Sequence, residues 1–361
     1  STVSWWGLWH RVDEWREGIR SAAEHSLHGA ALGVFLGLVI GDEGSIPDEI
    51  RQGFMATGTV HILSISGSHL GLITLVLFFS VRWALRRLPP GWLERLPVWA
   101  TPTRQACVLA WIGVCGYTLL AGPLVATTRS FVMVTVFLVA VWLGYPQHLL
   151  RALAFAALLI LSHDPRALFD MSFQLSFLSV LTIGLIVRRR EPDLDVDVDS
   201  VPVPPGRFSR LVRLRDLTTD SIRLSLAVTL ATLPLVAFYF NQVSWLGVFA
   251  NLWVVPVAGF LLVPLGLCAA LGTILVGGES LAGGSLLQIC LEPFIRGVMW
   301  MAKIPGAEWF VASPSVPVMV VYWICLTALV VSPVRWGKAV AGLLVFGCLT
   351  WWGGSPRLWE E

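Results

Sequence analysis

The longest run without a charged side chain most constrains the fold. Residues 224–278 contain no Asp, Glu, Lys, Arg or His, a run of 55 positions. About 20 apolar residues suffice to cross the hydrocarbon core of a bilayer, so this run predicts at least two membrane spans. Over the whole chain 56% of residues are hydrophobic and 13% are charged, against about 45–50% and about 25% in soluble domains. The composition therefore argues against a water-soluble globule.

Apolar segments recur along the chain and predict an all-α, polytopic membrane helical bundle of about eight to eleven spans. The candidate segments are residues 28–41, 58–81, 105–121, 124–143, 149–162, 167–187, 221–240, 245–277 (one or two spans), 281–300, 316–332 and 339–352. We expect four regions: an amphipathic interfacial helix over 1–25, a motif-bearing N-terminal half of the membrane domain over 26–187, a charged, Pro-rich linker over 188–220, and a C-terminal half over 221–361.

The first 25 residues predict an amphipathic helix, because apolar side chains recur there at helical spacing on one stripe. The stripe consists of Trp5, Leu8, Trp9, Val12, Trp15 and Ile19. We expect this helix to lie in the membrane interface and to contact lipids. The alternative is a helix packed on a neighbouring soluble domain, and neither interpretation gives it a catalytic role.

Charge arguments must be local, because the net charge is only +2 and supplies no overall field that would hold nucleic acid. Arginine gathers in two connections, over residues 82–104 and 188–215. Four apolar segments separate them, so both can face the cytoplasm as the positive-inside rule requires. The second connection also contains the acidic and Pro-rich stretch EPDLDVDVDSVPVPPG, which predicts a mobile linker.

Residues 41–79 carry an unusual density of polar groups for an apolar region. Ser45 and Asp48 form a capping-box pattern with Pro47 in the first turn, which predicts a short helix to about Met55. Further along, polar side chains crowd around glycines in a stretch without formal charge: His61, Ser64, Ser66, Gly67, Ser68 and His69.

A helix broken or re-entrant near Ser66, Gly67 and Ser68 would expose backbone polar groups, which membranes tolerate only in protein or beside a wet cavity. We therefore predict that this break lines a pathway. The alternative is that the small residues permit close helix packing and that neighbouring carbonyls satisfy each histidine.

Further polar candidates stand in later apolar segments. Arg129 is the only charged residue between Arg104 and Arg151, and it should face protein or water unless it reaches the boundary by snorkelling. Its planar donors suit phosphate or carboxylate. Asp164 and Pro165 predict an N-cap and first turn of the next helix. In that helix Asp170 is the natural ion partner of Arg129, although a direct ligand role is equally open.

Two amides complete the candidate set. Gln174 lies four residues after Asp170, so the two share one flank of a predicted helix. Asn251 is a candidate for the lining of a cavity, whereas Asn241 and Gln242 predict a turn between spans. Six cysteines lie in apolar segments without CxxC or histidine at metal-ligand spacing, so we predict no metal and no cofactor.

Three ordered segments resemble a known family. ATGTVHILSISGSHLGLI, GPLVATTRSFVM and DPRALFDMSFQLSFLSV resemble motifs of the transmembrane competence domain in ComEC-type DNA uptake proteins. Residues 26–185 are the most diagnostic part, and the C-terminal half matches mainly in hydropathy. The chain departs from the family pattern at Thr59, Ser64, Ser68 and Ser130, which stand where apolar residues are usual.

The resemblance implies a channel that carries single-stranded transforming DNA across the cytoplasmic (inner) membrane during natural competence. It implies that His61, Ser66, Gly67 and His69 form a broken-helix wall and that Arg129 meets phosphates or braces Asp170. Implied partners are single-stranded DNA, membrane lipids, the OB-like and nuclease domains of full-length relatives, a DNA receptor, and a cytoplasmic motor or single-strand-binding proteins. The chain contains no H-x-H-x-D-H cluster, so we expect no nuclease activity from it.

Two other function classes stay open from the residues alone. A secondary transporter of a small anion could use a helix N-terminus at mid-membrane as its anion site. An intramembrane hydrolase could use Ser66 as nucleophile with His61 or His69 as base. A continuous wet path would favour the channel, whereas a closed pocket would favour a transporter or an enzyme.

Overall fold

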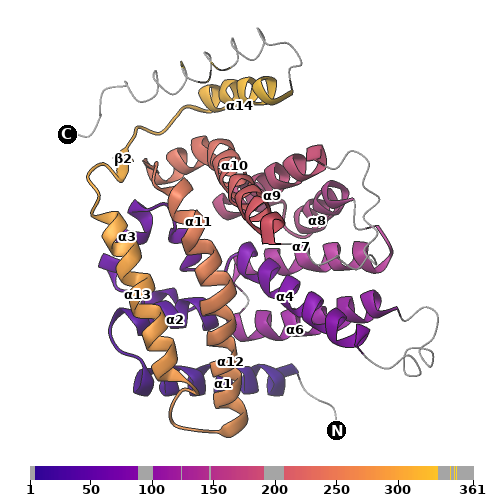
Figure 1. Ribbon diagram of the computed structural model, residues 1–361, viewed down its shortest axis with the longest axis vertical. Helices are drawn as coiled ribbons and strands as arrows, with labels where there is room; N and C mark the ends of the chain where they lie inside the picture. Colours follow the sequence, from indigo (N-terminus) through magenta and orange to yellow (C-terminus); the bar gives the residue numbers. More distant parts are fainter. Residues whose placement is uncertain are drawn as a thin grey trace. The chain divides into compact units, whose positions relative to one another are not determined.

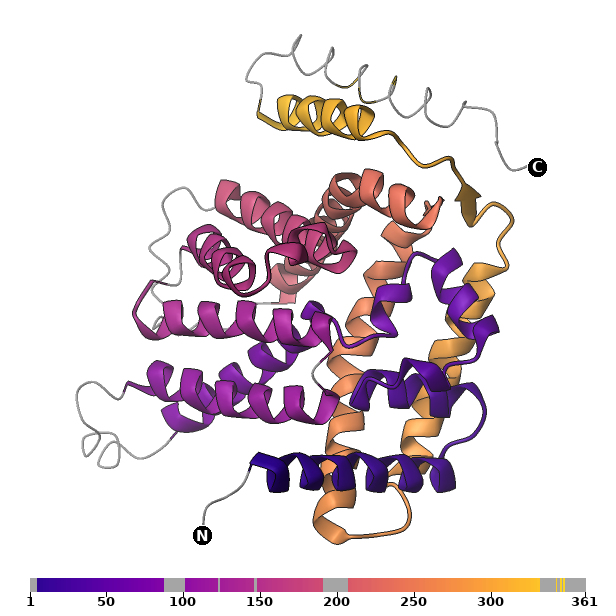
Figure 2. The same cartoon turned by 180° about the vertical axis from the view of Figure 1, so that it is seen from behind.

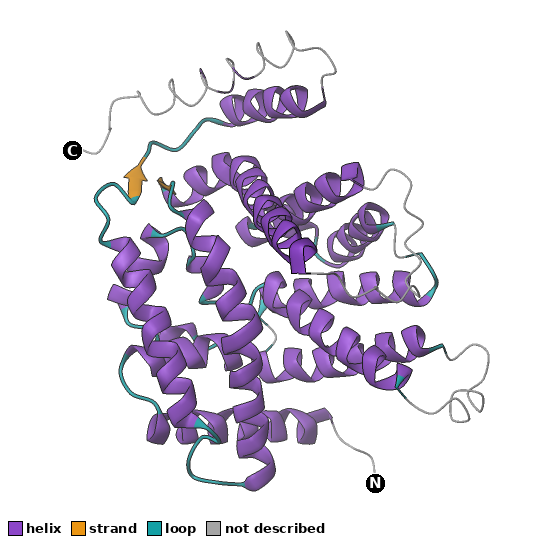
Figure 3. Cartoon of the chain, in the orientation of Figure 1, coloured by secondary structure: helices purple, strands orange, loops and turns teal. Residues whose placement is uncertain are grey.

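The computed structural model describes residues 5–87, 101–122, 124–145, 148–190 and 207–331, with the single positions 342, 345 and 347. Regular structure in these ranges is almost entirely helical (Figure 3), which confirms the all-α prediction. The α-helices are α1 (Trp5–Ser26), α2 (Ala30–Ile40), α3 (Asp48–Ala56), α4 (Gly67–Arg86), α6 (Pro102–Ala121), α7 (Val125–Trp142), α8 (Leu149–His163), α9 (Met171–Arg190), α10 (Arg207–Phe240), α11 (Gly247–Val257), α12 (Val263–Val276), α13 (Gly284–Ala302) and α14 (Val316–Val331).

Short elements link these helices. They are the 3-10 turns η1 (Glu43–Ser45), η2 (Val60–Ile62) and η3 (Pro165–Phe169), the π-helical segment η4 (Ala258–Leu262), and the strands β1 (Gln242–Ser244) and β2 (Glu308–Phe310). The predicted linker over 188–220 is helical at both ends, because α9 runs to Arg190 and α10 begins at Arg207. Its acidic and Pro-rich centre and most of the predicted segment 339–352 lie outside the described residues.

Five helices among the described residues are long and apolar enough to cross a membrane. They are Gly67–Arg86, Pro102–Ala121, Val125–Trp142, Thr218–Phe240 and Gly247–Val276. The last joins α11, η4 and α12 into 30 residues, so the predicted segment 245–277 is one continuous helical stretch. Shorter apolar helices are Ala30–Ile40, Leu149–His163, Met171–Val187 and Val316–Leu329.

The chain divides into two compact units that do not follow its sequence halves. Unit 1 contains Ser1–Met55, Thr59–Ala167 and Trp253–Lys303, and unit 2 contains Ala56–Gly58, Leu168–Leu252 and Ile304–Glu361. In unit 1, α4, α6 and α7 pack on one another and α8 packs on α7 (Figure 1). In unit 2, α10 packs on α9 and α14.

The π-helical segment η4 packs closely on α4. Pro264 at the start of α12 has no N–H to donate, and the Val263 N–H donates to the Ala258 carbonyl, five residues back. A Cβ on Gly259, inside this segment, would lie 2.7 Å from Leu72 Cδ2 of α4. Glycine at this position therefore permits backbone-to-side-chain packing that any larger residue would push apart.

Helix α1 packs on unit 1 through part of its predicted apolar stripe. Val12 and Ile19 are buried, against neighbours that include α2 and α12, whereas Trp9 and Trp15 remain exposed. Figure 2 shows α1 crossing α12 and α13. The helix thus has one face on its own chain and an exposed tryptophan face. Lipid contact and packing on a neighbouring soluble domain both stay predictions for the exposed tryptophans.

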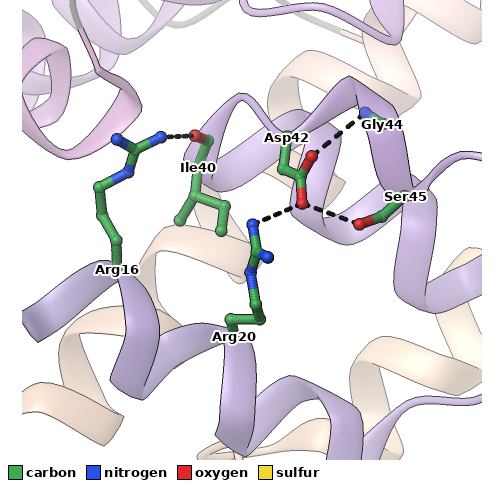
Figure 4. A network of polar contacts seen from close by, with 6 residues as sticks. All are labelled: Arg16, Arg20, Ile40, Asp42, Gly44 and Ser45. Carbon is green, nitrogen blue, oxygen red and sulfur yellow. Dashed lines mark hydrogen bonds and ion pairs between the residues drawn. The ribbon is translucent and has the colours of Figure 1, made fainter. Parts of the chain in front are cut away.

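Two arginines tie α1 to the end of α2 (Figure 4). Arg16 donates to the Ile40 carbonyl at 3.1 Å, where the C-terminal end of a helix carries partial negative charge. Arg20 donates to the Asp42 carboxylate at 2.7 Å, and that carboxylate also accepts from the Gly44 N–H at 3.1 Å and the Ser45 hydroxyl at 2.8 Å.

This network corrects the predicted capping box at Ser45 and Asp48. The Ser45 hydroxyl serves the preceding turn η1 by donating to Asp42, so it is not the cap of α3. Instead α3 begins at Asp48, and its first turn is closed by the Arg51 N–H donating to the Pro47 carbonyl at 3.0 Å. The short helix itself was predicted.

In unit 2 a proline explains how α14 is held on α10. Pro234 has no N–H for the Leu230 carbonyl four residues earlier. The Tyr322 hydroxyl of α14 donates to that carbonyl at 2.9 Å, and the Trp323 indole donates to the next carbonyl, Ala231, at 2.9 Å. Side chains of α14 therefore satisfy the backbone group that the proline leaves open.

We predict that Tyr322→Phe lowers the free energy of unfolding by about 1–2 kcal/mol, because it leaves the Leu230 carbonyl without its donor. Thermal unfolding in detergent measures this change. The matched control is Tyr145→Phe, at an exposed ring, which should have little effect. Equal effects of the two variants would contradict this account.

A second prediction concerns the attachment of α1. Asp42→Ala should remove three hydrogen bonds, loosen α1, and make the Arg16 and Arg20 peptide bonds several-fold more sensitive to trypsin. Glu24→Ala, at an exposed position of the same helix, is the control and should leave the cleavage rate unchanged. An unchanged rate in Asp42→Ala would show that apolar packing alone holds the helix.

Candidate functional site

The predicted interruption lies just before α4. After α3 the backbone makes only the turn η2 before it reaches Ser66, and α4 begins at Gly67 with Ser66 as its N-cap. Ser66, Gly67 and Ser68 therefore form the start of a helix rather than an unwound middle. The break is placed earlier than predicted because serine favours the N-cap and His69 completes a capping box with it.

His69 holds the approach to α4 in place. Its side chain is 3% exposed, and its Nδ1 accepts from the Ser66 N–H at 3.4 Å. The ring also has a hydrogen bond with the backbone of Ser64, and His61 lies close enough to interact with it electrostatically. Because Nδ1 is an acceptor, the neutral ring carries its proton on Nε2. His69 thus links the first turn of α4 to Ser64 and Ser66, which lie just before the helix.

Polar groups of this helix start lie at the surface of unit 1. Gly67 and Ser68 are exposed, whereas His69 and Leu70 are buried. The Ser66 and Ser68 hydroxyls are 2.6 Å apart and share a hydrogen bond. The first N–H groups of a helix have no partner within the helix, so this surface combines two hydroxyls with backbone donors.

The first turns of α7 contribute buried polar side chains beside this surface. Thr127, Arg129 and Ser130 are 0%, 5% and 2% exposed. Arg129 is therefore enclosed by protein. Ser130 donates to the Ala126 carbonyl at 2.8 Å, and its Oγ would lie 3.2 Å from a Cβ on Gly67.

The starts of α4 and α7 lie at the same end of unit 1. A Cβ on Gly41 would be 2.8 Å from the Ala121 carbonyl at the end of α6, 3.3 Å from Leu124 before α7, and 3.4 Å from Ile65 before α4. Helices α4 and α7 therefore run parallel, with α6 antiparallel to both. Their two N-termini place partial positive charge at this end.

Asp170 and Gln174 form a capping structure in unit 2. Asp170 accepts from the Ser172 hydroxyl and from the Phe173 N–H, the latter at 3.0 Å. Gln174 donates to the Leu168 carbonyl at 3.0 Å and accepts from the Tyr239 hydroxyl of α10 at 3.1 Å. These bonds set the start of α9 and join it to α10.

The start of α9 corrects one sequence prediction. The Arg166 N–H donates to Asp164 at 3.0 Å, so Asp164 is a cap as predicted, but only of the turn η3. The α-helix begins at Met171 because Asp170 supplies a second cap. Arg129 and Asp170 belong to different units, and their ion pair stays a prediction.

The remaining residues considered in the sequence analysis are Asn251 and Asn241. Asn251 lies in α11, and its buried Oδ1 has no hydrogen-bond partner among the described residues. Asn241 makes the predicted turn, with a φ of 54°. A cavity of about 540 Å³ in unit 2 is lined by Thr327 and apolar residues of α14, and one of about 250 Å³ in unit 1 lies beside Arg16 and Arg20. Neither cavity includes a predicted site residue.

Two side chains next to candidate residues, Thr127 and Tyr239, were not predicted from the sequence. Thr127 is fully buried beside Arg129, and the run of polar residues TTRS at a helix start was the available signal. Tyr239 bonds Gln174 from another helix, and no spacing in the sequence indicates that pairing.

Comparison with known proteins agrees with the sequence motifs. The family model described as Competence protein matches residues 38–336. ComE operon protein 3 of Bacillus subtilis (strain 168) is 25% identical over 71% of this chain and 28% of its own length. Competence protein ComA of Neisseria gonorrhoeae is 26% identical over 84% of this chain and 38% of its own length.

A third relative is the uncharacterized protein YcaI of Escherichia coli (strain K12), 26% identical over 65% of this chain and 28% of its own length. The chain thus spans well under half the length of these relatives. No solved structure matches. Because the family model covers most of the chain, this protein belongs to the Competence protein family.

Proposed function

We propose that this chain is the membrane part of a DNA uptake protein and forms the path by which a single strand crosses the cytoplasmic membrane during natural competence. The family membership supports a role in competence. The observation that most supports this path is the polar start of α4, where Ser66 is half-buried and Gly67 and Ser68 are exposed at the beginning of a candidate membrane span.

Polar groups inside a membrane segment are costly and usually mark a pathway. Here they are held by a specific structure: His69 fixes the bend, and Gly67 packs on Ser130 beside the buried Arg129. A conducting path must bind its substrate weakly enough to release it. A lining of neutral hydroxyl and backbone groups, with one enclosed arginine, fits the passage of a phosphate chain.

Other elements of the proposal extend to the full-length protein. His61, Ser64, Asp170, Gln174 and Asn251 would line or brace the path. The relatives are much longer than this chain. On the family resemblance, we propose that OB-like and nuclease domains, a DNA receptor and a cytoplasmic motor or single-strand-binding proteins act with it. Transport rather than hydrolysis is the activity proposed for the chain itself.

The geometry at Ser66 does not favour a hydrolase. A serine nucleophile needs a base within hydrogen-bond reach of its oxygen. The Ser66 hydroxyl instead shares a hydrogen bond with Ser68, and His69 Nδ1 accepts from the Ser66 backbone. A small-anion transporter would use the same helix start, so transport assays must separate it from a DNA path.

We predict that Arg129→Ala and His69→Ala reduce DNA uptake in competent cells to background while the protein remains in the membrane. The first variant removes an enclosed charge, and the second releases the bend before α4. Transformation frequency and membrane immunoblots measure the two effects. Arg129→Lys should rescue only in part, because an ammonium group lacks the planar fork of donors.

Arg151→Ala is the matched control for this prediction. Arg151 is exposed on α8, so its loss should leave the transformation frequency near wild type. Wild-type frequency in both Arg129→Ala and His69→Ala would show that the path has been placed on the wrong residues.

A further inference from the structure

We infer that the N-terminus of α4 binds a phosphate group through uncharged donors, and that this group belongs to the backbone of single-stranded DNA. The donors are the Gly67 and Ser68 N–H groups and the Ser66 and Ser68 hydroxyls. The choice of DNA as the source rests on the proposed function, whereas the phosphate chemistry rests on the site alone.

The helix start supplies the first observation. Helix α4 is 20 residues long, and helix N-termini favour anions because N–H groups and the helix dipole point at the ligand. Gly67 and Ser68 are exposed, and their N–H groups have no acceptor among the described residues. Parallel α7 places a second N-terminus at the same end.

A buried threonine supplies the second, independent observation. Thr127 of α7 is 0% exposed, and its hydroxyl has no hydrogen-bond partner among the described residues. Buried hydroxyls without partners are rare in folded proteins and call for a ligand or water. Thr127 precedes Ser130 by three residues, about one turn, so it lies on the face of α7 whose Ser130 meets Gly67 of α4.

Glycine at position 67 lets the start of α4 lie close to Ser130 of α7. A Cβ there would lie 3.2 Å from Ser130 Oγ, a tight contact that would have to be relieved by movement between α4 and α7. One turn further, a Cβ on Gly71 would meet nothing within 4 Å. The two glycines therefore differ in role, and Gly71 gives a matched control on the same helix.

Uncharged donors change how phosphate binding at α4 depends on salt concentration. Cations that contact phosphates release counterions, so binding through them falls steeply with salt. Hydroxyl and N–H donors release none, and Arg129 is enclosed rather than presented at the surface. The α4 contribution to affinity should therefore fall less steeply with salt concentration than binding through lysine or arginine.

The test uses the full-length protein in detergent with two labelled oligonucleotides of one sequence, one with a phosphodiester backbone and one with an uncharged methylphosphonate backbone. Ser68→Ala should weaken phosphodiester binding about three- to tenfold and leave methylphosphonate binding unchanged. Gly71→Ala should leave both unchanged. Equal loss for the two backbones, or no loss for either, would overturn the inference.

Ser68→Asp separates binding from folding. An acidic residue in the first turn stabilises a helix, so the melting temperature should hold or rise while the added charge repels phosphate and lowers phosphodiester affinity at least tenfold. A variant that keeps wild-type phosphodiester affinity would contradict the site.

Inorganic phosphate as competitor distinguishes this inference from the proposed function. If phosphate binds in a manner that depends on Ser68 while the wild-type protein binds no single strand, the site stands but DNA is overturned as its source. If Arg129→Ala abolishes uptake while Ser68→Ala keeps phosphodiester affinity, the proposed path stands and the phosphate site is overturned.

Discussion

The core of a bilayer contains no water, so every backbone N–H and C=O group there must find its partner in the protein. This constraint explains the contacts that define both units. The Leu230 carbonyl, which Pro234 leaves open, accepts from Tyr322. The π-helical segment before Pro264 bonds Val263 to Ala258. The bend before α4 is closed by His69. In each case a side chain or an irregular bond replaces a helical one.

The same constraint makes the start of α4 a candidate site. At Gly259 in η4, by contrast, the irregular backbone packs on a neighbour, because a Cβ there would lie 2.7 Å from Leu72 Cδ2. At Gly67 and Ser68 the backbone is exposed with hydroxyls beside it. This surface is the feature on which the proposed path rests.

Much of this arrangement could be predicted from sequence, because hydropathy and glycine, proline and serine act locally. The helical class, the short helix after Pro47, the turn at Asn241 and the interruption near Ser66 follow from such signals. The residues that cap α3 and α9 were harder to predict from the sequence. Asp164 caps the turn η3, whereas Asp170 caps α9 itself. The Ser45 hydroxyl donates to Asp42 and is therefore not the cap of α3. The contacts of Ser130 with Gly67 and of Tyr239 with Gln174 depend on packing between distant segments.

A photocrosslinking measurement tests the central claim most directly. A benzophenone amino acid at position 68 or at position 79 of the full-length protein would be activated while a labelled strand is trapped in transit. Phe79 is on the same helix and 55% exposed. Our account predicts a DNA adduct from position 68 and lipid adducts from position 79. Lipid adducts alone from position 68, with DNA captured only elsewhere, would contradict it.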